Sequence, residues 1–159
     1  MFSADRHVIK IGFFASSRNV CSCGYRYAHV ELRFSDYSVT SITRTPTGKV
    51  HIIPGKRMSN PMYCCFFEVV IEPTVEEQMV QFAEQSLDMT SFSAIAMYWN
   101  FTPLLRRYPI RKLGTFCSAY VCRLLQIGEL CQELDPDTTS PDDLFYSLAR
   151  DERVVCSSK

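Results

Sequence analysis

Cys117 is the residue of this chain whose type and position best suit a nucleophile. It stands at the start of a segment with helical periodicity, directly after Gly114-Thr115-Phe116. The unpaired N–H groups and the dipole of a helix N-terminus stabilise a thiolate and lower the pKa of a cysteine there. The same N–H groups can form part of an oxyanion hole. The alternative interpretation is a buried, inert thiol, because the chain holds eight cysteines.

A thiol nucleophile needs a base, and the candidate is His29, which lies in a stretch where polar and apolar residues alternate. Such alternation predicts a half-buried strand, one side of which is formed by Tyr27, His29, Glu31 and Arg33. Since residues two apart on a strand point the same way, the Glu31 carboxylate can accept a proton from the imidazole and fix its tautomer. The pattern predicts Cys117 as nucleophile, His29 as general base and Glu31 as the orienting carboxylate.

The segment from Thr115 to Gly128 resembles the nucleophile helix of NlpC-like, papain-fold thiol hydrolases. More narrowly, it is similar to their circularly permuted branch, where the motif begins Thr-x-Cys-Ser-x-x-Val and is followed by Thr-x-Pro-x-Asp-Leu. Residues 139–144 of this chain match the second motif. The permuted branch carries its histidine before its cysteine, in a strand with the pattern His-Val-x-hydrophobic, which His29-Val30-Glu31-Leu32 matches. The resemblance extends over residues 26–148.

This resemblance implies that Cys117 is the nucleophile and His29 the base, and it leaves the third polar residue open. In the family that residue often lies about a dozen positions past the histidine, which is near Ser41 here, where His, Asn or Gln is more usual. Some permuted members place a carboxylate close to the histidine, and this favours Glu31, since a carboxylate stabilises an imidazolium better than a hydroxyl. A competing histidine, His51, is either the orienting residue or a partly buried strand residue.

The activity implied by the resemblance is that of a thiol hydrolase or acyltransferase acting on an amide, ester or isopeptide bond. Its substrates would be peptides, isopeptides or lipid acyl groups. Compact permuted members also occur in large DNA viruses such as poxviruses, so the alternative is a virion or capsid-associated structural protein with little or no catalysis. That setting implies the cytoplasm of the host cell, packaging in a virion, and viral structural proteins as partners.

Length and charge further narrow the classes of protein to which this chain can belong. A chain of 159 residues with 47% apolar residues is expected to form one domain over residues 1–159. Lys plus Arg and Asp plus Glu both number 17, which argues against a nucleic-acid binder. No stretch approaches the ~18 apolar residues of a transmembrane helix. The N-terminal residues lack the apolar core of a signal peptide, so we expect a reducing compartment.

Four of the cysteines raise a third hypothesis, a zinc-binding regulatory protein: Cys21, Cys23, Cys64 and Cys65. Structural zinc sites use pairs separated by two to four residues, and neither pair has that spacing. We therefore expect no metal and no cofactor. Two further clusters are expected to be structural: the basic residues Arg106, Arg107, Arg111 and Lys112 as a solvated loop, and the aromatic residues Tyr98, Trp99 and Phe101 as core.

The elements that must position the site follow from the periodicity. Strands are predicted at residues 7–14, 26–34, 38–43, 49–53 and 63–71, and helices at 75–87, 116–127 and from Ser140 onward, with a short helix and a loop at 91–108. Thr74 is the expected N-cap of the first helix, with Glu77 completing a capping box. Strands followed by helices predict an α+β fold, an antiparallel sheet packed against helices. The resemblance implies the circularly permuted papain-like version of it.

Overall fold

The structure is a computed structural model that describes residues 7–15, 26–42, 48–56, 58, 63–102, 104–108 and 114–157. Its elements are β1 (His7–Ala15), β2 (Tyr27–Arg33), β3 (Val39–Ile42), β4 (Val50–Ile53), β5 (Tyr63–Ile71), α1 (Pro73–Met89), α2 (Ala94–Phe101), the 3-10 helix η1 (Leu105–Arg107), α3 (Cys117–Ile127), α4 (Pro141–Leu148) and β6 (Val154–Ser157). The predicted α+β class is confirmed.

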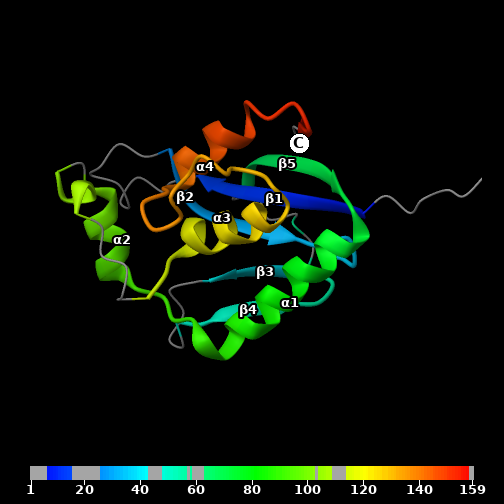
Figure 1. Cartoon of the computed structure of the whole chain (residues 1–159), viewed down its shortest axis with the longest axis horizontal. Helices are drawn as coiled ribbons and strands as arrows, with labels where there is room; N and C mark the ends of the chain where they lie inside the picture. Colours follow the sequence, from blue (N-terminus) through cyan, green and yellow to red (C-terminus); the bar gives the residue numbers. More distant parts are fainter. Residues whose placement is uncertain are drawn as a thin grey trace, which may run out of the picture.

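The six strands form one antiparallel sheet in the order β4-β3-β2-β1-β5-β6. Helices α1 and α3 lie side by side on one face of this sheet, and α4 lies beside β2 (Figure 1). The main core fills the space between them and contains the apolar residues of β1, β2 and α3. Strand β2, which carries His29, is therefore central in the sheet and lies under the helix that carries Cys117.

Strand β2 is interrupted by a bulge next to His29. The register with β1 shifts so that Ala28 is an additional residue between Tyr27 and His29. The Tyr27 ring consequently lies in the main core, 5.3 Å from the Phe13 ring, whereas the His29 ring lies 5.1 Å from the ring of Phe14. The prediction that Tyr27 shares a side with His29 is wrong, because simple alternation cannot anticipate an inserted residue.

The start of α1 also differs from the prediction. Its N-cap is Glu72, which makes no side-chain capping hydrogen bond, and Pro73 occupies the first turn. Proline is favoured at the first helical position because its missing N–H has no partner there in any case. The helix therefore begins before Thr74, and the expected capping box of Thr74 with Glu77 does not form.

Two other predictions need correction at the edges of the molecule. Strand β6 follows the predicted elements and was not expected; it pairs with β5 along one edge of the sheet. Tyr98 was expected in the core, but 54% of it is exposed. None of the helices in the described part of the chain is both long and apolar enough to cross a membrane.

Candidate active site

Cys117 is the first residue of α3 and is only 4% exposed. The chain reaches it through Gly114, whose φ of +96° is open to glycine and strained for other residues. A Cβ at Gly114 would also lie 2.6 Å from the carbonyl oxygen of Ser91. Behind the thiol, the buried Ser118 hydroxyl donates to the carbonyl of Thr139 at 2.7 Å. The start of α3 is thus held on both sides, which fixes the direction of the Cys117 side chain.

The structure brings Cys117 and His29 together, and the two side chains are hydrogen-bonded to each other. Burial by itself lowers the pKa of His29, but the Cys117 sulfur and the Glu31 carboxylate more than offset it and raise that pKa to about 9. Burial by itself raises the pKa of Cys117. The charge and hydrogen bond of His29, with backbone hydrogen bonds from Val30 and Ser118, lower that pKa below its ordinary value. These opposite directions favour the ion pair of a thiolate with an imidazolium over the neutral pair.

Glu31 lies on the same side of β2 as His29, as the spacing predicted. Its Oε1 is 3.4 Å from Nε2 of His29, and its side chain is 3% exposed against 22% for the histidine. The ammonium group of Lys56 donates to both carboxylate oxygens, at 3.0 and 2.8 Å. A buried carboxylate needs such a partner to remain ionised. Lys56 therefore keeps Glu31 charged where it faces the imidazole.

Ser41 reaches the same nitrogen from the neighbouring strand. The ladder between β2 and β3 pairs Leu32 with Thr40, and past it the Ser41 hydroxyl donates to the carbonyl of Val30 at 2.9 Å. The same Oγ lies 3.4 Å from Nε2 of His29. Both candidates for the third residue, Glu31 and Ser41, are therefore next to the imidazole, and only Glu31 brings a charge.

The other two histidines have different surroundings. His51 faces Ser41 across the β3–β4 ladder, and burial lowers its pKa, with Lys56 and His29 adding to the effect and Glu31 opposing it. The lowered pKa favours the neutral form of His51 beside the charged side chains of Glu31, Lys56 and His29. His7 lies at the start of β1, where its Nδ1 contacts the buried carboxylate of Glu76.

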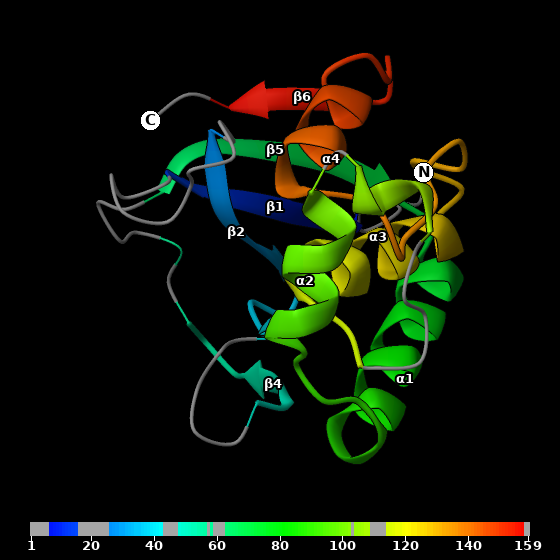
Figure 2. The ribbon, with the colours of Figure 1, turned by 90° about the vertical axis from the view of Figure 1, so that its left-hand side faces the viewer.

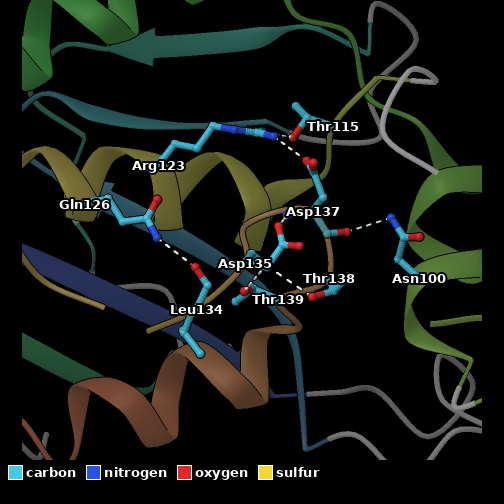
Figure 3. A network of polar contacts seen from close by, with 9 residues as sticks. All are labelled: Asn100, Thr115, Arg123, Gln126, Leu134, Asp135, Asp137, Thr138 and Thr139. Atoms are coloured by element: carbon cyan, nitrogen blue, oxygen red, sulfur yellow. Dashed lines mark hydrogen bonds and ion pairs between the residues drawn. The ribbon is translucent and has the colours of Figure 1, made fainter. Parts of the chain in front are cut away.

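A polar network holds α3 to the segment that follows it (Figure 3). Arg123 of α3 pairs with the Asp137 carboxylate and donates to the Thr115 hydroxyl at 3.1 Å. Gln126 donates to the carbonyl of Leu134 at 2.8 Å. Arg123 and Gln126 are therefore bonded to the loop that follows α3, and Arg123 also holds Thr115, two residues before the candidate nucleophile.

Two residues of this site were missed from the sequence. Lys56 follows a Pro-Gly turn, and a lysine after a turn carries no signal of a buried partner. Asp142 was interpreted only as an acidic residue of a helix start. Its carboxylate also accepts the backbone N–H groups of Arg26 and Tyr27, each at 2.8 Å, and so anchors the beginning of β2 just ahead of His29.

Within the described residues, no group of three or more His, Cys, Asp and Glu side chains is arranged to hold a metal ion. Cys64 and Cys65 lie on β5, where the sulfur of Cys65 is 3.6 Å from that of Cys156 on β6. Cys21 and Cys23 lie outside the described residues, so the four-cysteine zinc hypothesis is not tested and the expectation of no metal stays a prediction.

Comparisons of this chain with protein-family models, with curated proteins and with solved structures find no match, and the geometry around Cys117 is therefore the basis on which a function is proposed.

Proposed function

We propose that this protein is a thiol hydrolase or acyltransferase in which Cys117 is the nucleophile and His29 the general base. One observation carries the proposal: the thiol at the start of α3 is hydrogen-bonded to an imidazole that also faces a buried carboxylate. A nucleophile, a base within reach and a third group that orients the base form the arrangement of covalent acyl-transfer enzymes.

The proposed reaction begins with the Cys117 thiolate, which attacks the carbonyl carbon of an amide, ester or isopeptide. The negative charge that develops on the carbonyl oxygen is stabilised by N–H groups at the start of α3. The His29 imidazolium then gives its proton to the leaving amine or alcohol, and a thioester remains on Cys117. Water, deprotonated by His29, hydrolyses that thioester; an acyltransferase would use another nucleophile in place of water.

Glu31 has the role of a positioning residue in this scheme. Because its Oε1 faces Nε2 of His29, we assign Nδ1 as the ring nitrogen that exchanges the proton with Cys117. The carboxylate stabilises the imidazolium form and fixes the ring orientation. Lys56, which holds both oxygens of Glu31, keeps that carboxylate ionised.

We further propose that the chain belongs to the circularly permuted, NlpC-like branch of the papain-like fold. Three features in chain order support this: a histidine in the strand β2, a later cysteine at the start of α3, and a Thr-x-Pro-x-Asp-Leu segment that begins α4. An antiparallel sheet covered by the nucleophile helix is compatible with such a fold.

The test is the pH dependence of Cys117 alkylation by iodoacetamide, with each cysteine quantified by peptide mass mapping. The alkylation rate of wild-type Cys117 is expected not to fall as the pH is lowered well below 8, because the thiolate persists there. Cys122 and Cys131 serve as internal controls, since burial raises their pKa values to about 12 and about 11. In His29→Gln, burial is the dominant influence left on Cys117, and its reaction below pH 8 should disappear.

A Cys117 that titrates at its ordinary pKa of 9.0 contradicts the ion pair. Turnover needs a second measurement, the burst of nitrophenol from a nitrophenyl ester. A burst of one equivalent that is lost in Cys117→Ala supports the enzyme. A reactive thiolate without any burst or turnover on esters or amides would instead favour a structural protein that keeps the fold.

A further inference from the structure

The chain makes an excursion immediately before the nucleophile helix. It leaves and returns at adjacent points, because Phe92 bridges to Thr115 and the N–H of Ser93 donates to the carbonyl of Thr115 at 2.8 Å. We call the part of this excursion that carries α2 and η1 the arm; it comprises residues 93–102 and 104–108. In Figure 2 the arm lies nearest the viewer, with α2 in front of α3. Thr115, where the chain returns, is two residues before Cys117.

The inner side of the arm is packed firmly against the start of α3. Ala96 is fully buried in a small cluster with Phe116 and Ala119, and the Phe101 ring lies 5.0 Å from that of Phe116. The Asn100 amide donates to the carbonyl of Asp137 at 2.6 Å (Figure 3). The arm is therefore a fixed part of the domain, and its other side has a defined position relative to the candidate site.

The arm also exposes large apolar side chains that lie close together in the sequence. The exposed fractions are 66% for Ile95, 54% for Tyr98, 75% for Leu104 and 75% for Tyr108. Trp99 joins the two helices, since its indole N–H donates to the carbonyl of Tyr108 at 2.9 Å. Single exposed apolar residues are ordinary, whereas four large ones on α2 and at the two ends of η1 indicate an interaction surface.

The sequence around the arm also carries an excess of positive charge. The chain as a whole is neutral, yet it has no Asp or Glu between Asp88 and Glu129. Within that interval four cations follow α2 within a few residues of one another: Arg106, Arg107, Arg111 and Lys112. The one cation of α3, Arg123, is paired with Asp137. An apolar and aromatic surface is thus combined with a local excess of positive charge.

We propose that the arm is a docking surface for an anionic lipid bilayer. Apolar side chains that enter the interfacial region, Tyr and Trp at the headgroup level, and Lys or Arg facing acidic headgroups are the combination that binds such surfaces. Four cations in a stretch of the sequence that holds no Asp or Glu favour an acidic lipid surface over an apolar protein face. Docking would hold the Cys117 end of α3 toward the bilayer, and it requires no catalysis by Cys117.

The test is cosedimentation of the full chain with vesicles of phosphatidylcholine alone or mixed with phosphatidylserine. Binding is expected only to the mixed vesicles, and it should weaken as salt is added. The emission of Trp99, the single tryptophan of the chain, should shift to shorter wavelength on binding. Affinity should fall about tenfold or more in the double variants Ile95→Ser/Tyr98→Ser and Arg106→Gln/Arg107→Gln.

The matched control is Val70→Ser/Val155→Ser, which removes two exposed apolar residues from β5 and β6 and should bind like the wild type. Unchanged far-UV circular dichroism and an unchanged midpoint of urea denaturation show that an arm variant is folded, and they are scored separately from lipid binding. The proposal is overturned if the wild type ignores the mixed vesicles, binds both kinds equally, or binds through the control residues. Binding to polyglutamate but not to vesicles would overturn it in favour of an acidic protein partner.

Discussion

Two oxygen atoms lie at the same distance from Nε2 of His29, and their chemistry differs. Glu31 Oε1 and Ser41 Oγ are each 3.4 Å from it. The Ser41 hydroxyl proton is directed to the carbonyl of Val30, so this oxygen offers the imidazole only a lone pair. Glu31 offers a full charge that Lys56 keeps in place. At equal distance a charged acceptor interacts with the imidazolium more strongly than a neutral hydroxyl does, which favours Glu31 as the third residue.

Substitution of these residues should separate the two roles. In Glu31→Gln the pKa of His29 is expected to fall from about 9 toward its ordinary value, and that of Cys117 to rise. Ser41→Ala should move both pKa values less and reduce the free energy of unfolding by about 1–2 kcal/mol, because the buried carbonyl of Val30 loses its donor. Imidazole NMR titration and urea denaturation measure the two effects.

Lys56→Met is the control for the charge of Glu31. It removes the cation that keeps the carboxylate ionised, so the pKa of His29 should fall in this variant as well, by no more than in Glu31→Gln. A larger fall in Ser41→Ala than in Glu31→Gln would show that the hydroxyl, and not the carboxylate, orients the imidazole.

At the scale of the elements, the helix α4 and the strand β2 depend on each other. The Asp142 carboxylate in the first turn of α4 accepts the N–H groups of Arg26 and Tyr27, and it thereby aligns the strand that carries His29. Neighbouring Asp143 instead completes the capping box with Ser140 inside α4. Of these two adjacent aspartates, Asp142 links α4 to β2, whereas Asp143 caps α4 itself.

Asp142→Ala is expected to lower the free energy of unfolding by about 1–3 kcal/mol and to speed hydrogen exchange at the Tyr27 amide, which loses its acceptor. Asp143→Ala should destabilise α4 by about 1 kcal/mol while the Tyr27 amide stays protected. Equal exchange at Tyr27 in both variants would mean that the bond to Asp142 does not hold the start of β2. Exchange measured by NMR distinguishes these outcomes.

Sequence periodicity was sufficient for the elements whose signals are local. The alternation around His29 and the apolar spacing of α3 placed both correctly, and the cap of α4 at Ser140 was recognised from Ser-Pro-Asp-Asp. What it missed depends on contacts far apart in the chain. The bulge at Ala28 and the ion pair of Lys56 with Glu31 are properties of neighbouring strands and loops, and no single stretch encodes them.

For the whole molecule, the Cys117–His29 pair links folding to pH. The pKa of His29 is about 9 when folded and 6.5 ordinarily, so its stabilisation is complete below about pH 6.5 and lost as the pH rises to about 9. The pKa of Cys117 is below its ordinary 9.0, so its stabilisation is present above pH 9 and lost as the pH falls. Where the folded Cys117 is a thiolate, the two slopes cancel between about pH 6.5 and 9, because the folded and unfolded pairs then bind the same number of protons.

The difference in unfolding free energy between wild type and His29→Gln isolates this pair from the other titrating groups. In the variant Cys117 is expected to remain a thiol when folded and when unfolded, so it adds no slope below pH 9. We expect the difference to be level between about pH 6.5 and 9 and to shrink below 6.5, by up to about 1.4 kcal/mol per pH unit. Urea denaturation across this range measures it. An imidazolium held by Glu31 beside a neutral thiol predicts the opposite profile, largest below pH 6.5 and declining toward pH 9, and that result would remove the thiolate on which the proposed nucleophile depends.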